Sequence, residues 1–306
     1  MYYEIENGKI KKADIKNISL AGKNRYIGLI GIDETGGVLP VIHLSDRQLR
    51  ESLESAALTY ENHDGFDLIC LNLLNHKALT TSQANRVCIY VHKNLLLFIC
   101  RNVNTVAGLL HDIIQEGSSV DADRMLSIFF ERMTAKDADH LEKIETEISN
   151  LEDALITTAK KNSVREIIHL RKRLMILKRY YEQLLNVLDL LQENENNLLD
   201  DRAMRFFKIF SGRVDRLYHS VLNLRDYVTQ VREAYQAEVD ISLNSTMKIF
   251  TVITAIFLPL SLIVGWYGMN LQMPEVKWSF GYPMVILLSV AVVVFCLVYF
   301  KKKKWF

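Results

Sequence analysis

The sequence predicts an α+β membrane protein. An N-terminal α/β cytoplasmic domain is followed by a helical hairpin and a very long stalk helix, which continues into the first of two C-terminal transmembrane helices. Three observations predict this fold class: short apolar runs in the first third of the chain, heptad-like apolar spacing in its middle, and two long uncharged segments at its end. The chain has 306 residues, more than a single compact domain usually needs.

Residues 1–110 are predicted to form the α/β domain. Their apolar runs have the length and composition of strands and span 26–33, 66–74, 86–92 and 95–101. Lys93 and Asn94 separate the last two runs, which indicates a hairpin turn. Residues 46–58 are expected to form a short helix between the first two runs.

Residues 111–200 are predicted to form a helical region with an antiparallel hairpin. Apolar residues recur at steps of three and four along both arms: Leu141, Ile144, Ile148, Leu151 and Leu155, then Leu170, Leu174, Leu177, Tyr181, Leu184, Leu188 and Leu191. The turn is expected at Asn162 and Ser163. The first arm is mainly acidic and the start of the second is mainly basic. These charges either pair with one another on solvated faces or attract cations.

Residues 201–248 are predicted to form the stalk helix. From residue 201 to Pro259 the sequence has no other proline, and its only glycine is Gly212. A helix of about 60 residues is roughly 90 Å long, whereas the hydrocarbon core of a bilayer is roughly 30 Å thick. The stalk is therefore expected to project deep into the cytoplasm and to link a soluble domain mechanically to the membrane.

Residues 249–300 are predicted to form a two-helix transmembrane domain. No charged residue occurs from Ile249 to Pro274 or from Trp278 to Phe300. Both segments are apolar enough to cross a bilayer, and Pro259 is expected to kink the first. The loop 267–280 connects the two spans.

The basic tail, residues 301–306, predicts the orientation of the chain. Four consecutive lysines follow the second span, and cytoplasmic ends of spans carry an excess of Lys and Arg. Both termini are therefore expected in the cytoplasm and the loop 267–280 outside. These features predict a multi-pass protein of the cytoplasmic (inner or plasma) membrane.

Overall composition argues against several classes of protein. Lys and Arg together number 37 and Asp and Glu 36, so no excess of positive charge indicates a nucleic-acid partner. The four cysteines have neither CxxC nor zinc-ligand spacing, which predicts reduced buried thiols. The expected hairpin allows Cys88 and Cys100 to face each other, which would not make them a redox pair. The sequence has no nucleotide-binding P-loop motif, and no organic cofactor is expected.

A mildly polar stripe follows one side of the first span. It consists of Asn244, Met247, Thr251, Thr254, Leu258, Ser261 and Gly265, which recur at steps of three and four. Such a stripe either lines a pore or packs closely against a partner helix. Two spans cannot enclose a pore alone, so the first interpretation requires a homo-oligomer with one span from each chain around an axis.

The most specific motif lies directly after the first span. Gly268-Met269-Asn270 follows Tyr267, and a Met-Pro-Glu sequence ending at Glu275 comes next. This arrangement resembles the CorA family of magnesium transporters, whose signature is Gly-Met-Asn after the first of two C-terminal spans. The resemblance extends to the residues around Pro259, the Gly-Tyr-Pro that opens the second span, and the lysine tail. It covers the N-terminal part of the chain only in layout.

The resemblance implies a funnel-shaped homopentamer whose first span lines the pore. Gly268, Met269 and Asn270 would form the selectivity filter, with Asn270 holding the hydrated ion and Glu275 raising the cation concentration at the outer mouth. Mg²⁺ releases its water reluctantly, and amide oxygens can accept hydrogen bonds from that water. The spans contain no carboxylate or histidine to relay protons. Passive, channel-like Mg²⁺ transport is therefore expected, and Co²⁺ and Ni²⁺ also suit such a filter.

In the family, metal ions bound between cytoplasmic domains close the pore, and the resemblance implies the same regulation by Mg²⁺ here. The sequence does not identify the regulatory site. Its acidic candidates are Asp64, Asp67, Asp200, Asp201 and Asp215. The expected partners are further copies of the chain, membrane lipid and divalent cations.

The sequence leaves three alternative functions. The first is the zinc-transporting branch of the same superfamily, against which Met269 argues. The second is a non-conducting membrane scaffold, against which the polar stripe and the motif argue. The third is an enzyme, whose only suggestive groups are His111 with Asp112 and His140 near Asp137 and Asp139. No nucleophile accompanies them, so no enzymatic activity is expected.

Overall fold

The computed structural model describes residues 2–6, 9–13, 20, 24–42, 44–55, 57–74, 86–115, 121–157, 163–269, 279–303 and 305. The predictions made for Asn270, Glu275 and Asn162 therefore lie outside the described residues. The chain divides into two compact units, Met1–Val231 and Arg232–Phe306. Helix α7 (Asp201–Tyr267) contributes residues to both.

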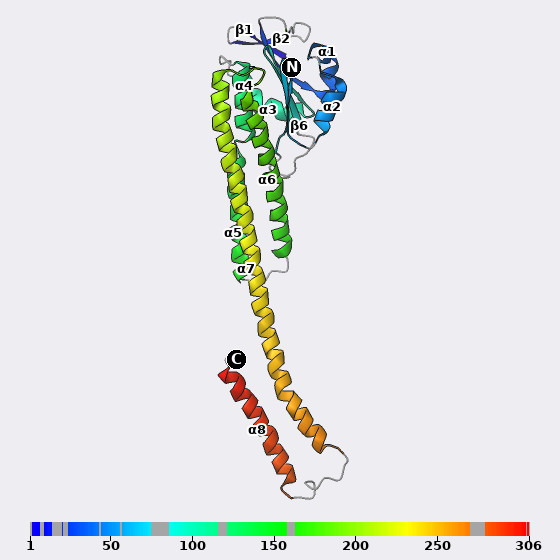
Figure 1. Ribbon diagram of the computed structural model, residues 1–306, viewed down its shortest axis with the longest axis vertical. Coiled ribbons are helices and arrows are strands. Elements are labelled where there is room, and N and C mark those ends of the chain that lie inside the picture. The colour runs from blue at the N-terminus through cyan, green and yellow to red at the C-terminus, as the bar shows by residue number, and fades with distance from the viewer. Residues whose placement is uncertain are drawn as a thin grey trace. The chain divides into compact units, whose positions relative to one another are not determined.

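The N-terminal unit is built on one seven-stranded sheet (Figure 1). Its strands are β1 (Tyr2–Glu6), β2 (Lys9–Ala13), β3 (Arg25–Gly31), β4 (Thr59–His63), β5 (Phe66–Asn72), β6 (Arg86–His92) and β7 (Leu95–Cys100). They lie in the order β2-β1-β3-β7-β6-β5-β4, with β3 and β7 parallel and all other neighbours antiparallel. His92 pairs with Leu95, which confirms the predicted hairpin.

Both faces of the sheet are covered, which explains why its central strands are apolar throughout. In β5, Ile69 and Leu71 pack in the core shared with α3 (Val103–Gln115) and α4 (Ala122–Met133). The alternate residue Leu68 packs on the other face, in the core shared with α1 (Leu39–Ile42) and α2 (Asp46–Glu54). A short 3₁₀ helix, η2 (Ile32–Gly37), lies between β3 and α1. Successive strand residues point to opposite faces, so a strand covered twice is apolar without alternation.

The sequence prediction did not include the strands β1, β2 and β4, and it placed the end of α2 four residues too late. β2 and β4 are the two edges of the sheet, where polar residues are common, so a search for apolar runs does not find them. The helix predicted for 46–58 begins as expected, with Ser45 and Gln48 forming a capping box. It ends at Glu54, because the chain from Thr59 pairs with β5 instead.

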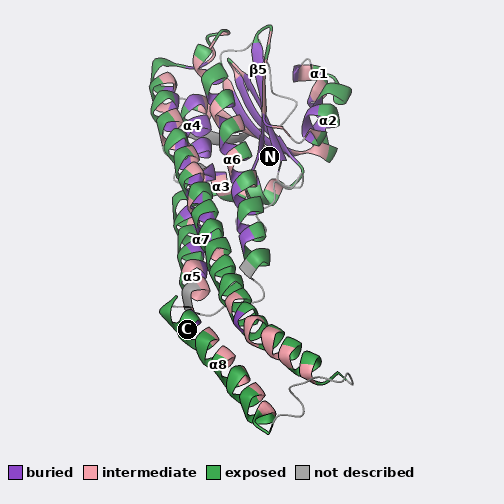
Figure 2. Ribbon diagram, turned by 60° about the horizontal axis from the view of Figure 1, so that its bottom comes forward, coloured by how far each residue is buried: buried purple, intermediate pink, exposed green. Residues whose placement is uncertain are grey.

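Three long helices complete the N-terminal unit. They are α5 (Asp137–Thr157), α6 (Ser163–Glu193) and the first part of α7. The predicted seams are confirmed, because their residues are buried except Leu155, which is half-buried. α7 adds a third seam at steps of three and four: Ala203, Phe207, Phe210, Val214, Leu217, Val221, Leu224, Val228 and Val231. Figure 2 shows this buried side in purple, with exposed residues on the opposite side.

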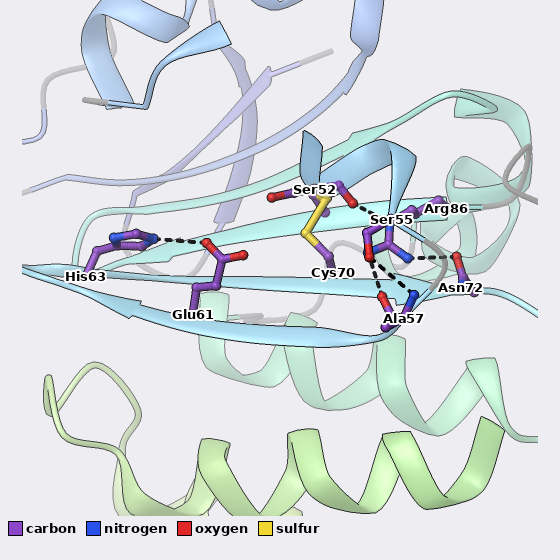
Figure 3. The surroundings of a disulfide bond; sticks show 9 residues. Ser52, Ser55, Ala57, Glu61, His63, Cys70, Asn72 and Arg86 are labelled. Atoms are coloured by element: carbon purple, nitrogen blue, oxygen red, sulfur yellow. Dashed lines mark hydrogen bonds and ion pairs between the residues drawn. A yellow bond between two sulfur atoms is a disulfide. The ribbon is translucent and has the colours of Figure 1, made fainter. Parts of the chain in front are cut away.

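The cysteines contradict the prediction of reduced thiols. Cys70 and Cys88 face each other in the β5–β6 register, their Cα atoms are 4.1 Å apart, and a disulfide joins them (Figure 3). Cys88 does not face Cys100 across the β6–β7 hairpin either. Cys88 pairs with Ile99, so Cys88 and Cys100 lie in the cores on opposite faces of the sheet. The free Cys100 thiol is buried, and burial raises its pKa to about 12.

The C-terminal unit consists of the second part of α7 and α8 (Gly281–Lys302). Both helices contain an apolar window long enough to cross a membrane, and only 6% of each window is buried. Cys296 of α8 donates a hydrogen bond from Sγ to the carbonyl oxygen of Ala255, at 3.7 Å. α7 continues without interruption through Pro259, so the predicted helix that runs from stalk to span is confirmed.

Candidate functional site

Within the C-terminal unit, the part of α7 that precedes the Gly-Met-Asn motif has sides of different character. Val252 is buried, and the neighbouring Ala255 accepts the bond from Cys296, so these residues mark the side toward α8. Phe250, Ile253 and Phe257 form an exposed, strongly apolar side. The predicted polar stripe occupies a third side, because each residue step turns a helix by about 100°.

Every residue of this polar stripe is exposed in the single chain. Its members are Asn244, Met247, Thr251, Thr254, Leu258, Ser261 and Gly265. α8 covers none of them, so the stripe is accessible to another copy of the chain or to an aqueous path. Packing of α7 on α8 therefore does not account for its composition. Its role in lining a pore stays a prediction.

The threonine hydroxyls of the stripe are available to its surroundings as hydrogen-bond acceptors. Thr251 donates from Oγ1 to the carbonyl oxygen of Met247, at 2.8 Å, and Thr254 donates to the carbonyl oxygen of Phe250. Because each hydroxyl proton is used within the helix, the remaining lone pairs of the oxygen accept hydrogen bonds from outside. Acceptors of this kind suit the water shell of a cation, whose hydrogens point outward.

The end of α7 explains the glycine of the Gly-Met-Asn motif. The Gly268 amide donates to the carbonyl oxygen of Val264, at 2.8 Å, and the Met269 amide donates to that of Trp266, at 3.4 Å. A Cβ atom at residue 268 would lie only 2.7 Å from the Val264 oxygen. A larger residue would therefore displace the turn that leads to Asn270, although Asn270 and Glu275 themselves lie outside the described residues.

The five acidic candidates for a regulatory site are dispersed over the N-terminal unit. Asp67 is buried and accepts a hydrogen bond from Asn196 Nδ2, at 2.8 Å. Asp200 caps α7 by accepting from the Ala203 amide, at 2.7 Å. Asp64, Asp201 and Asp215 are exposed. Among the described residues, no group of three or more His, Cys, Asp or Glu side chains is arranged to hold a metal ion.

A cluster of charged residues that the sequence prediction missed surrounds the start of α7. Arg25 of β3 forms an ion pair with Asp121, at 2.5 Å, and lies 4.0 Å from Asp123. Asp123 Oδ2 also accepts from the Asp200 amide, at 3.3 Å. The Asp121 and Asp123 carboxylates thus lie beside one guanidinium where β3 and α4 meet the start of α7. The sequence signal was an Asp-x-Asp at a helix start, but its long-range partners are not visible in sequence.

The Asp123 carboxyl is expected to make folding stability depend on pH. Burial is the main cause that raises its pKa from 3.8 to about 6, with help from Asp121 and Asp200, against the effect of Arg25. The folded chain therefore binds this proton more tightly than the unfolded chain, and stability falls as pH rises through about 4 to 6. The difference corresponds to roughly 3 kcal/mol at neutral pH.

Asp123→Asn is accordingly expected to raise the unfolding free energy by roughly 2–3 kcal/mol at about pH 7 and to leave it nearly unchanged at about pH 4. Asparagine resembles the protonated carboxyl and keeps an acceptor for the Asp200 amide. Thermal unfolding of the purified chain at both pH values measures the effect. Asp121→Asn is the control. Its unfolding free energy should not rise at neutral pH, because Asp121 is half exposed and pairs directly with Arg25. An Asp123→Asn variant that is less stable than wild type at neutral pH would contradict this account.

Comparisons with known proteins agree with this architecture. Residues 42–302 match a family model described as "CorA-like Mg2+ transporter protein". The cobalt/magnesium transport protein CorA of Thermotoga maritima is 28% identical over 251 residues, which cover 80% of this chain and 72% of that protein. The magnesium transport protein CorA of Wolinella succinogenes is 43% identical over 76 residues, 24% of each chain.

Solved structures show the same fold. The complete structure of the CorA magnesium transporter from Methanocaldococcus jannaschii superposes with a TM-score of 0.80 at 21% identity, covering 100% of this chain and 99% of that one. The cytoplasmic domain of ZntB from Vibrio parahaemolyticus has a TM-score of 0.62 at 13% identity, covering 78% and 97%. The family match spans most of the sequence and concerns transporters rather than enzymes. The chain belongs to the CorA-like Mg²⁺ transporter family.

Proposed function

We propose that the chain is a passive, channel-like pathway for Mg²⁺ across the cytoplasmic membrane, formed by a homopentamer with α7 around the pore. The observation that carries the proposal is the uncovered polar stripe of α7, which ends shortly before the Gly-Met-Asn motif in the sequence. Asn270 is the proposed filter for the hydrated ion, and Glu275 concentrates cations outside it. Both termini are proposed to lie in the cytoplasm.

The chemistry of the stripe supports a passive mechanism. It offers hydroxyl, amide and thioether groups without a fixed charge, so a divalent cation is not held too tightly to leave. Met247 and Leu258 place apolar side chains at two positions along the proposed pore. In a narrow pore such a constriction can stop conduction by dewetting. The two spans contain no carboxylate or histidine for proton coupling. Co²⁺ and Ni²⁺ are proposed as further permeant ions, and cytoplasmic divalent ions as the signal that closes the pore.

Flux into liposomes tests this proposal. Purified protein is reconstituted around a Mg²⁺-sensitive dye, without ATP and without a pH gradient. We expect Mg²⁺ to enter down its gradient, faster when a K⁺ diffusion potential makes the interior negative, and to slow when Mg²⁺ is raised on the cytoplasmic side. Zn²⁺ flux that appears only under a pH gradient, without Mg²⁺ flux, would indicate a zinc transporter instead. Absence of both fluxes would indicate a scaffold.

A further inference from the structure

One side of α6 carries exposed apolar residues among cations. Val164, Ile168 and Met175 are 50%, 48% and 60% exposed and follow one line along the helix, opposite its buried seam. Arg171 and Lys172 lie beside them and are exposed as well. Solvent alone is a poor partner for a line of apolar side chains, and such a line indicates a surface that another molecule covers.

α7 extends this surface into a groove. Its lining residues are Ile168, Arg171, Lys172, Met175, Arg225 and Thr229, and its volume is about 270 Å³. We call it the basic groove. Half of these described lining residues are cationic and none is acidic. The groove therefore suits a partner that combines negative charge with enough apolar surface to cover Ile168 and Met175.

The same unit presents a complementary surface on α5. The outer side of α5 carries Asp139, Glu142 and Glu145, all exposed. We call it the acidic ridge. Other acids of α5 already have partners within the chain: Glu147 pairs with Arg173 of α6, and Glu152 accepts a hydrogen bond from Tyr227 of α7. Asp139 and Glu142 lie on the side of α5 away from those contacts, and Glu145, one heptad before Glu152, lies at the edge toward α7.

The acidic ridge and the basic groove lie at the same level of the helix bundle. Tyr181 of α6 donates to Asp137 of α5, at 2.9 Å, and Arg173 pairs with Glu147. These two contacts fix the antiparallel register of α5 and α6. Glu142 and Glu145 lie between them on α5, and Met175 lies between them on α6. Copies of the chain related by rotation about an axis along the bundle would therefore bring ridge and groove together without an axial shift.

We propose that the basic groove receives the acidic ridge of a second copy of this chain. The contact uses different surfaces on the two copies, as a ring of identical subunits requires, and its charges are complementary. It rests on the proposed function, because a pore requires a homo-oligomer. The carboxylates face Arg171, Lys172 and Arg225, while the ridge backbone and side-chain stems cover Ile168 and Met175.

Cross-linking between two differently tagged full-length chains tests the contact. One chain carries Met175→Cys and the other Glu145→Cys, both with Cys296→Ala, and they are co-expressed and treated with a short bismaleimide in the membrane. We expect a cross-linked species that contains both tags, and none when either cysteine is present alone. Adding Arg171→Glu with Lys172→Glu to the first chain should lower its yield several-fold. Adding Glu142→Lys to the second should restore part of the yield.

Other outcomes would overturn the proposal in distinct ways. An oligomer that conducts Mg²⁺ but gives no mixed cross-link would reject this interface and leave the proposed function standing. Cross-links only between two Met175→Cys chains would mean that the groove meets itself. Protection of Met175→Cys from labelling by anionic lipid alone, without the mixed cross-link, would assign the groove to a membrane surface. A monomer without Mg²⁺ flux would reject the proposed function and the interface together.

Discussion

Replacing Asn270 with alanine is expected to reduce Mg²⁺ flux into liposomes by at least about a hundredfold. A hydrogen bond to a charged partner contributes about 1.5–3 kcal/mol, which corresponds to roughly ten- to hundredfold in an equilibrium constant. In a ring of identical subunits the substitution removes one amide from every chain. The hydrated ion then loses several acceptors at the entrance, while no other part of the proposed path is altered.

Gln272→Ala is the matched control for this experiment. Gln272 has the same amide group and lies two residues after Asn270 in the same loop, outside the Gly-Met-Asn motif. Its flux should stay near that of wild type, and both variants should elute as the same oligomer. Undiminished Mg²⁺ flux through the Asn270→Ala protein would show that ion selection takes place elsewhere. Equal loss in both variants would point to damage of the loop rather than of a filter.

Local sequence patterns predicted those parts of the fold that rest on repeated apolar spacing. The seams of α5 and α6, the β6–β7 hairpin and the helix through Pro259 follow from residues close together in sequence. The edge strands β2 and β4 were missed because their residues are polar and their pairing depends on neighbours far along the chain. The disulfide was missed for the same reason, since only the β5–β6 register places Cys70 opposite Cys88.

In the candidate site, too, some features were predicted from residues close together in sequence and one was not. The stripe from Asn244 to Gly265 can be read from helical spacing, and its exposure in the structure agrees with that spacing. The tight turn at Gly268 follows from a motif, and the structure supplies its physical reason. Asp123 was not predicted, because its raised pKa depends on burial and on Asp121, Arg25 and Asp200, which come from three separate elements. Sequence spacing carries no information about such a meeting point.

Arg86 is the position where a single substitution is expected to reduce folding stability most. Its side chain is fully buried at the start of β6, although a cation at a strand end is normally expected in solvent. Nε donates to the carbonyl oxygen of Ser52, at 2.6 Å, Nη2 to that of Ala57, at 2.7 Å, and Nη1 to Asn72 Oδ1, at 3.2 Å (Figure 3). The guanidinium thus ties the end of α2 to β5 and β6.

Two opposing effects decide what Arg86→Leu does. Burial disfavours the cation and lowers the pKa of Arg86, and none of its three acceptors above is a carboxylate, so an apolar residue relieves a desolvation penalty. However, two of the acceptors are backbone carbonyls that lose their donor, the Ser52 oxygen in a buried and the Ala57 oxygen in a partly buried position. Each unsatisfied acceptor costs about 1–3 kcal/mol. The second effect outweighs the first, because the three acceptors lose the same donor group together, and a net loss of roughly 3–5 kcal/mol is expected.

Thermal unfolding of the full-length protein in detergent measures this loss. Arg86→Lys should be intermediate, because an ammonium group donates from a single point and cannot reach all three acceptors. Arg47→Ala is the control on the same helix–sheet layer: its side chain is 87% exposed, and its loss should change stability by no more than about 0.5 kcal/mol. If Arg86→Leu unfolded at the wild-type temperature, the desolvation penalty of the buried cation would be as large as the stabilisation from its three hydrogen bonds. The guanidinium would then orient the end of α2 without stabilising the fold.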